Sequence, residues 1–530
     1  MNNTKIFILD STLRDGAQGQ NISFSLEDKI KICRALDSIG IDYIEAGNPS
    51  SNPKDIEFFR AINELSFKSK IVAFGSTRKP NIDVKDDKGL ESLINSTSNT
   101  VTIFGKSSEF QVKEILKTSL EENLNMIDES IKYLVYNGLE VIFDAEHFFD
   151  GFKENEDYAI KTLLIAENAG AKSLVLCDTN GGTLPNEITE IVGKVKKLVK
   201  IQLGIHCHND IGMAVANSTN AILAGVTHLQ GTFLGIGERC GNTNLSSIIP
   251  TLQLKLEYKV IKDSEMKNIT SIARYLGEVS NITLSDELPY VGNSAFAHKG
   301  GMHIDAVVKN SKSYEHIDPE SIGNSRKLLV SEVSGRSTIL NQVQKIFPNI
   351  NRNSKEILLI TDKLKQLEHT GYQFEGAEAS IELIIRKIIG KYRPFFKLNS
   401  FKTIVEEEST KNNFTSTALI NIEVENRNEI TAAEGEGPIN ALDKALRKAL
   451  EVFYPQLKYV RLVDYKVRVL DTDRGTDSKV RVLIESTDGV ESWSTIGVSR
   501  DIIEASWIAL VDSIEYKLIK DIEKNVKTYF

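Results

Sequence analysis

Strand-like and helix-like segments alternate along the first half of this chain, and this alternation restricts the fold more than any other feature. Short apolar or β-branched segments, which we expect to be strands, occur at residues 6–9, 43–46, 71–74, 100–104, 140–144, 173–177, 203–206 and 227–231. Amphipathic stretches that we expect to be helices separate them, among them 26–39, 121–136, 157–169 and 187–199. Such alternation is typical of a parallel sheet with helical crossovers. Eight strands predict an α/β fold, a closed (β/α)8 TIM barrel.

An open, doubly wound sheet is the alternative architecture. It would place a glycine-rich Gly-x-Gly-x-x-Gly turn after the first strand and its ligand at one switch point. No such turn follows residues 6–9, and polar motifs follow several different segments. We therefore favour the barrel.

Two histidines lie together at the end of the seventh expected strand. His206 and His208 are separated by Cys207, and alternate residues of a strand point to the same side. The chain contains only eight histidines, so two on one face are notable. Two imidazoles form half of a divalent-metal site, and we expect other segments to supply further ligands.

Polar residues also follow other expected strands, at the end where a barrel carries its active site. Asp15 offers a carboxylate ligand, and Arg14 beside it can stabilise an oxyanion. Glu146 and Thr179 follow the fifth and sixth segments, and Asn242 lies in a glycine-rich stretch after the eighth. Carboxylate, imidazole and amide ligands together suit Zn, Mn or Mg.

Bulk properties narrow the class of protein. A chain of 530 residues exceeds one core, so two or three domains are expected. The net charge of −9 argues against a nucleic-acid surface. No apolar run approaches the roughly 20 residues of a membrane span, and the start shows no signal-peptide pattern. Four scattered cysteines indicate a reducing, cytoplasmic setting.

Three motifs in this order resemble the signatures of a known enzyme family. They are Thr12-Leu13-Arg14-Asp15-Gly16, His206-Cys207-His208-Asn209-Asp210 and Gly237-Glu238-Arg239-Cys240-Gly241-Asn242. They are similar to motifs of the metal-dependent, acetyl-CoA-using synthases and lyases built on TIM barrels, which include 2-isopropylmalate, homocitrate and citramalate synthases. Residues 103–107, 143–151 and 176–185 resemble the citramalate synthase branch in particular. The similarity extends over essentially the whole chain.

The resemblance implies a Claisen-type condensation of acetyl-CoA with a 2-oxo acid, a step of branched-chain amino-acid biosynthesis. Pyruvate is the expected acceptor, (R)-citramalate the product and isoleucine the inhibitor. The implied ligands of the divalent metal ion are Asp15, His206, His208 and, as a possible fourth, Asn242. Arg14 would stabilise the oxyanion, Glu146 would orient the base or bind substrate, and Thr179 would bind the acceptor carboxylate.

The acceptor pocket is expected beside Glu146. Phe104 ends the fourth segment, while Phe143, Phe148 and Phe149 flank Glu146 in the sequence. If one of these rings, Phe104 first, closes over the side-chain pocket of the acceptor, a methyl group fits and an isopropyl group clashes. The other interpretation is that these rings are barrel–helix core.

The β/α rhythm ends near residue 259, and residues 260–390 are expected to form a helical connector. In the family a similar segment reaches over the barrel mouth, often from the partner subunit. The groups implied for it here are His303 and Tyr314, for proton transfer, and Asp305, for substrate binding. This chain has Gly300-Gly301 where relatives commonly have serine and glycine, and Ala306 where glycine is usual.

Residues 391–530 contain an approximate repeat of two β-β-β-α units. Gly435 and Gly437 lie before Pro438, which is typical of a helix start. The region resembles the allosteric dimerisation domain of 2-isopropylmalate and citramalate synthases, so a homodimer with an effector site near these residues is expected. A purely structural dimerisation domain is the other interpretation.

Two other functions stay open at this stage. One keeps the site chemistry with another acceptor or direction, as in 2-isopropylmalate synthase, homocitrate synthase or a lyase. The other is an inert barrel that senses an amino acid. A sensor would need a broken site, whereas the expected ligands Asp15, His206, His208 and Asn242 are all present.

Overall fold

The computed structural model describes residues 4–62, 65–329, 336–351, 354–374, 376–408, 413–470 and 478–527. It divides into two compact units, one formed by residues 1–296 and 315–326 and the other by 297–314 and 327–530. No helix within the described ranges is both long and apolar enough to cross a membrane.

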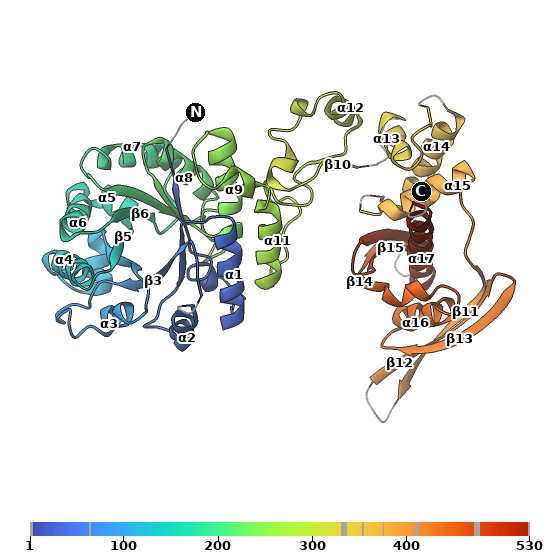
Figure 1. The fold of residues 1–530 in the computed structure, drawn as a ribbon, viewed down its shortest axis with the longest axis horizontal. Helices are drawn as coiled ribbons and strands as arrows, with labels where there is room; N and C mark the ends of the chain where they lie inside the picture. The colour runs from blue at the N-terminus through green and yellow to red at the C-terminus, as the bar shows by residue number, and fades with distance from the viewer. Residues whose placement is uncertain are drawn as a thin grey trace. The chain divides into compact units, whose positions relative to one another are not determined.

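The first unit is built on a closed barrel of parallel strands (Figure 1). Its strands are β1 Phe7–Asp10, β2 Tyr43–Gly47, β3 Lys70–Ser76, β4 Thr100–Lys106, β5 Glu140–Glu146, β6 Ser173–Asp178, β7 Gln202–Cys207 and β8 His228–Gly231. Closure comes from the pairing of β8 with β1, in which Phe7 lies opposite His228. This closure excludes the open sheet and confirms the predicted barrel.

Helices surround the barrel in Figure 1. They are α1 Leu26–Ser38, α2 Pro53–Ile62, α3 Lys88–Ile94, α4 Leu120–Tyr136, α5 Phe148–Glu154, α6 Glu156–Ala169, α7 Pro185–Val195, α8 Ala214–Leu223, α9 Leu245–Pro250, α10 Asp263–Met266 and α11 Ile269–Val279. Local signals set their ends: Ser25 and Asp28 form a capping box at α1, and Gly170 ends α6 at φ 105°.

Two apolar layers hold the barrel together. The larger lies between strands and helices and includes Ile44, Ile103 and Ile205. The smaller is a separate cluster that contains Leu9, Val72 and Cys177. Strand β6 is buried along its whole length, as expected for a parallel strand covered on both faces. The strands are therefore fixed firmly enough to position side chains at their carboxyl ends.

The second unit contains the two predicted β-β-β-α repeats. The first consists of β11 Lys397–Glu408, β12 Asn413–Val424, β13 Arg427–Gly435 and α16 Pro438–Leu450, and the second of β14 Arg461–Val469, β15 Val480–Thr487, β16 Ser492–Ser499 and α17 Ile502–Lys527. Each sheet is antiparallel, and its strands lie side by side in the order in which they follow one another along the chain. Each helix packs mainly on the last two strands of its own sheet.

The rest of the second unit consists of short elements and helices. These are β9 Ala297–His298, β10 Lys327–Leu328, α12 Gly301–Lys309, α13 Arg336–Ile346, α14 Lys355–His369 and α15 Glu378–Ile389. Ile360, Val343 and Ile385 belong to one apolar cluster that joins α13, α14 and α15. Residues 260–390 therefore contain α10 and α11 in the first unit and α12 to α15 in the second, and their role as a connector stays a prediction.

Candidate metal centre and active site

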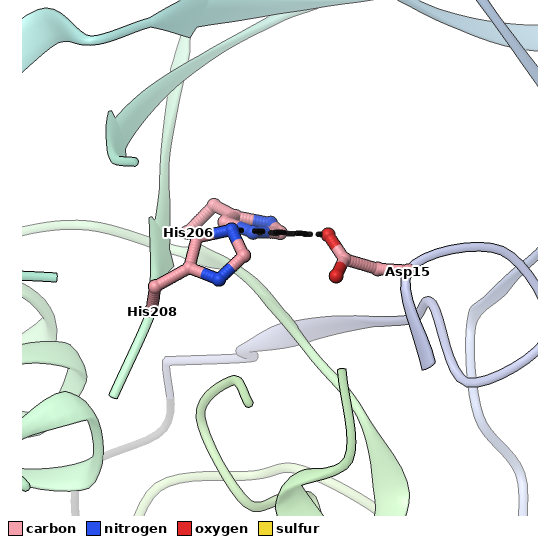
Figure 2. Close-up of side chains that lie close together, drawn as sticks. All are labelled: Asp15, His206 and His208. Carbon is pink, nitrogen blue, oxygen red and sulfur yellow. Dashed lines mark ion pairs between the residues drawn. The ribbon is translucent and has the colours of Figure 1, made fainter. Parts of the chain in front are cut away.

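Strand β7 and the turn after β1 bring three ligand groups together inside the barrel mouth. His206 lies on β7 and His208 one residue past its end, while Asp15 follows β1. Figure 2 shows both imidazoles beside the Asp15 carboxylate, whose Oδ2 lies 3.6 Å from His206 Nε2 and 4.0 Å from His208 Nε2. All three side chains are buried, and their ligand atoms lie within 4.8 Å of one another.

The position of His208 depends on the loop after β8. His208 forms an isolated antiparallel bridge with Asn242, and its backbone N–H donates to the Asp178 carbonyl. Asn242 also donates from Nδ2 to Asp15 Oδ1 at 2.9 Å. Asn242, the fourth expected ligand, is therefore in contact with Asp15 and His208.

The ligand set fits a divalent cation. Asn242 Oδ1 is buried and has no hydrogen-bond partner among the described residues. An unpaired buried oxygen costs free energy, which a bound cation offsets. Burial would raise the pKa of Asp15, but the charge of Arg14 and then those of His206 and His208 lower it to about 2. Burial, followed by the charge of His206, lowers the pKa of His208 to about 4. Both groups are thus ready to act as ligands at neutral pH.

Arg14 is fixed beside this cluster by three contacts. Its Nη1 donates to Asp15 Oδ2 at 3.0 Å and its Nε to Glu45 Oε2 at 2.7 Å. Its guanidinium carbon lies 3.8 Å from the centre of the Phe74 ring. Glu45 is fully buried and also accepts from the Ser11 hydroxyl at 2.6 Å. The cation therefore keeps one orientation without a substrate.

A cavity of about 230 Å³ brings together half of the predicted site residues, all of them in the barrel unit. Its lining includes Arg14, Asp15, Phe104, Glu146, Thr179, His206 and His208. Glu146 forms an ion pair with Lys106, and the Thr179 hydroxyl accepts a hydrogen bond from the His147 backbone N–H at 2.8 Å. Strand ends far apart in the sequence thus contribute to a single cavity.

Several lining residues were not among the predicted site residues: Gln18, Phe74, Asp144, Cys177, Glu238 and Arg239. Phe74 and Asp144 are the last residues of two expected strands, so the strand-end rule could have found them. Burial and then the Glu45 charge raise the pKa of Asp144. Arg239 is held by Asp210 through two bonds of 2.8 Å and donates to the Thr179 carbonyl.

The aromatic residues near the site divide into two groups. Phe104 lines the cavity and stacks on Phe74, with ring centres 5.5 Å apart. Phe143, Phe148 and Phe149 are fully buried in the core between barrel and helices and do not line the cavity. The expectation that any of the four rings could close the pocket therefore narrows to Phe104.

The remaining predicted residues lie in the second unit. His303 and Asp305 are on α12, and the His303 ring stacks on that of Tyr314 with centres 4.2 Å apart. Asp305 pairs with Lys309 one helical turn away. Gly435 ends β13, Gly437 is the N-cap of α16 and Pro438 is its first residue.

Comparison with known proteins matches three segments of the chain to family models. Residues 5–276 match the HMGL-like family, 290–371 the homocitrate synthase post-HMGL domain-like family, and 375–518 the LeuA allosteric (dimerisation) domain. The barrel, its ligand cluster and these matches define an HMGL-like barrel protein with a LeuA-type C-terminal domain.

Curated relatives are similar over nearly the full length. The (R)-citramalate synthase of Aquifex aeolicus (strain VF5) is 53% identical over 98% of this chain and 99% of its own. That of Geobacter sulfurreducens (strain ATCC 51573 / DSM 12127 / PCA) is 51% identical over 97% and 98%. The chain belongs to the (R)-citramalate synthase family. The resemblance inferred from the motifs is confirmed.

Proposed function

We propose that this chain condenses acetyl-CoA with pyruvate to give (R)-citramalate and CoA. It would act as a transferase that converts an acyl group into an alkyl group. The observation that carries the proposal is the convergence of Asp15, His206 and His208 with Arg14 on one barrel cavity. The relatives named (R)-citramalate synthase support the choice of product. An inert amino-acid sensor would not need this intact cluster.

Asp15, His206, His208 and Asn242 would hold a divalent metal ion, for which Zn, Mn and Mg are the candidates. When bound, such an ion supplies Lewis acidity toward the ketone of a 2-oxo acid. The protein's own contribution is the fixed, buried arrangement of its donors, because the carboxylate and imidazoles need little rearrangement on binding.

Arg14 would stabilise the negative charge that develops on the ketone oxygen. Its contacts with Glu45, Asp15 and Phe74 hold the guanidinium at the cavity wall before substrate arrives. A preorganised donor loses little free energy in reorientation during the reaction, which is why such groups contribute strongly to catalysis.

Thr179 and Glu146 would position the acceptor. The Thr179 oxygen already accepts from the His147 backbone, so its hydroxyl hydrogen can donate to the acceptor carboxylate. Glu146 lines the same cavity and would orient the reacting groups. His303 and Tyr314 would serve in proton transfer, and Asp305 in substrate binding.

Acetyl-CoA would occupy a second cavity of about 460 Å³ in the barrel unit. This cavity shares Arg14, Gln18, Phe74 and Phe104 with the first, so a thioester can reach the acceptor site. Its outer lining carries Lys54 and the polar residues Asn48 and Asn52, which suit the pantetheine amides and phosphates.

The C-terminal repeats would form a homodimer and carry feedback inhibition by isoleucine. The match to the LeuA allosteric (dimerisation) domain supports both proposals. The entry into α16 is the proposed effector region, because helix N-termini suit the carboxylate of an amino acid.

A panel of 2-oxo acids tests the activity directly. Purified protein is incubated with acetyl-CoA, Mn²⁺ and pyruvate, 2-oxobutyrate, 2-oxoisovalerate or 2-oxoglutarate, and free CoA is followed with a thiol reagent. We expect CoA release with the highest kcat/KM for pyruvate and citramalate as the product. Better use of 2-oxoisovalerate would identify a 2-isopropylmalate synthase, and no release from any acid would favour the sensor.

A further inference from the structure

Strand β8 contributes a buried glutamine, Gln230, that contacts His206 on the side of its ring away from Asp15. Gln230 lies directly opposite His206 in the register of the β7–β8 pair, and it is fully buried. Its Oε1 lies 2.9 Å from His206 Nδ1, the ring nitrogen other than the one next to Asp15. The backbone register thus places the glutamine against the back of the imidazole.

A second contact fixes the direction of the Gln230 amide. Its Nε2 donates to Asp144 Oδ1 at 2.9 Å, and Asp144 is itself buried. With that carboxyl oxygen as the acceptor, the amide NH₂ faces Asp144 and the amide oxygen faces His206. An amide oxygen only accepts, so His206 Nδ1 must carry the ring proton. In the neutral imidazole, His206 Nε2 then presents its lone pair toward Asp15.

Within the part of the chain that the structure describes, His208 has no counterpart of the hydrogen bond that Gln230 makes to His206. His208 Nδ1 is buried and has no hydrogen-bond partner among the described residues. The two imidazoles are therefore held differently: His208 by its backbone bridge to Asn242, and His206 by a side chain behind its ring.

We propose that Gln230, anchored by Asp144, is a positioning residue that fixes the tautomer and ring orientation of His206 for metal binding. A hydrogen bond to the second ring nitrogen of a histidine ligand orients the ring and raises its basicity, and loss of such a partner typically weakens metal affinity about 10–100-fold. This inference rests on the proposed metal centre.

The test compares three variants of the full-length chain: Gln230→Met, Gln230→Glu and the control Gln202→Met. Gln202 lies at the opposite end of β7, where its Nε2 contacts the Thr227 hydroxyl at 3.4 Å. Mn²⁺ and Zn²⁺ affinities are measured by competition with a chelator, and folding by circular dichroism. Gln230→Met should bind metal about 10–100-fold more weakly, whereas Gln202→Met should match the parent.

Gln230→Glu distinguishes loss of the hydrogen-bond acceptor from a change in packing at residue 230. A glutamate can still accept from His206 Nδ1, and one proton shared with the buried Asp144 carboxyl can replace the amide N–H, so we expect this variant to retain affinity within a few-fold of the parent. Affinity lost equally in the Glu and Met variants, or retained in the Met variant, would overturn the proposal. A parent that binds neither metal would instead overturn the metal centre itself, so the two failures are distinguishable.

A measurement on the parent does not depend on whether the variants fold. The chain has eight histidines, so long-range ¹H–¹⁵N spectra of metal-free, histidine-labelled protein contain few ring signals. His206 can be assigned by its absence in His206→Gln. We expect its proton on Nδ1, and a proton on Nε2 would contradict the proposal.

Discussion

At the scale of single residues, the ligand cluster consists of the Asp15 carboxylate and two imidazoles with different hydrogen-bond partners. His206 contacts the Gln230 side chain, and the backbone of His208 bridges to Asn242. The pKa of Asp15 is lowered to about 2 and that of His208 to about 4. At neutral pH the carboxylate is therefore charged and the His208 imidazole neutral, which is the state that binds a divalent ion. No proton has to leave either group before the metal enters.

Removal of one ligand charge should abolish catalysis without unfolding the barrel. We expect Asp15→Asn to lower kcat/KM at least about 10³-fold, because the proposed metal loses its only anionic ligand and Arg14 one of its partners. Metal content by mass spectrometry and circular dichroism accompany the CoA assay. Asp86→Asn, at an exposed position, is the matched control and should behave as the parent. Full activity of Asp15→Asn in metal-depleted buffer would contradict the assignment.

Phe104 should set the size of the acceptor. Its ring lines the cavity and is braced by Phe74, so Phe104→Ala opens space for an isopropyl group. The ratio of kcat/KM for 2-oxoisovalerate to that for pyruvate should rise by about 10–200-fold, the range for apolar fit. Phe110→Ala, at an exposed phenylalanine, should leave the ratio unchanged. An unchanged ratio in Phe104→Ala would exclude Phe104 as the selectivity residue while leaving the function intact.

His228 should make the barrel sensitive to acid. Its ring is fully buried, neither nitrogen has a partner among the described residues, and burial lowers its pKa from 6.5 to about 4. The unfolded chain takes up the proton near pH 6.5, whereas the folded chain resists it until about pH 4. The free energy of unfolding therefore falls as pH falls across this window.

Between pH 7.5 and 5, protonation of the unfolded chain at His228 should lower the free energy of unfolding by about 2 kcal/mol, since one pKa unit corresponds to about 1.4 kcal/mol. In His228→Leu this part of the pH dependence should be absent. The free energy of unfolding can be read from hydrogen exchange of the β1 and β8 amides. His369→Leu, at an exposed histidine, is the control and should follow the parent. A parallel pH dependence of parent and His228→Leu would contradict the expectation.

At the scale of elements, sequence reasoning located the strands well because each is a buried apolar run between polar loops. It placed His206 and His208 on one side by strand alternation, yet β7 ends at Cys207. His208 reaches the cluster because its backbone bridges to Asn242, a contact between distant segments. The two histidines do lie together with Asp15, but strand alternation accounts for the position of His206 alone, and their role as ligands stays a prediction.

The rings around Glu146 show where sequence reasoning fails. In β5, Asp144 and Glu146 line the cavity, whereas Phe143 lies in the core between barrel and helices. A strand that is buried on both faces carries no polar alternation to reveal which residues point inward. Phe148 and Phe149 belong to α5, whose start at residue 148 the sequence pattern did not indicate. Gln230 was missed because its partner Asp144 lies 86 residues away.

The entry into α16 should control feedback inhibition. A Cβ added to Gly435 would lie 2.5 Å from the Ala441 backbone nitrogen and 2.7 Å from Asn440 Oδ1, so Gly435→Ala must shift the start of the helix. A Cβ on Gly193 of α7 meets nothing within 4 Å, which makes Gly193→Ala, in the barrel unit, the matched control. We expect Gly435→Ala to raise the isoleucine concentration for half-inhibition at least about 10-fold, or about 1.4 kcal/mol in binding, with uninhibited kcat/KM unchanged.

Inhibition is measured with isoleucine, leucine and valine on the parent and both variants. Equal inhibition of Gly435→Ala and the parent by every amino acid would place the effector site elsewhere. Equal relief in both variants would show that the effect does not arise from the clash at Gly435.

At the scale of the whole molecule, the proposed site residues belong to two compact units. Arg14 and Asp15 lie in the barrel unit, whereas His303 and Tyr314 lie in the other. A homodimer can assemble such a site within one chain or across two, and its twofold symmetry makes both sites alike in either case. Mixed dimers distinguish these arrangements without any structural assumption.

We expect the site to be shared between subunits, because the resemblance of the motifs implies a connector segment supplied by the partner subunit. Arg14→Gln and His303→Asn chains are co-expressed with different tags, and the mixed dimer is purified through both. If the units combine across subunits, one site carries both substitutions and the other neither, so the mixed dimer should show roughly half the parental kcat. If they combine within a chain, each site carries one defect and activity should not exceed that of the two variants alone. Arg14→Gln paired with Asp15→Asn is the control, because both substitutions lie in the barrel unit and no arrangement leaves an intact site.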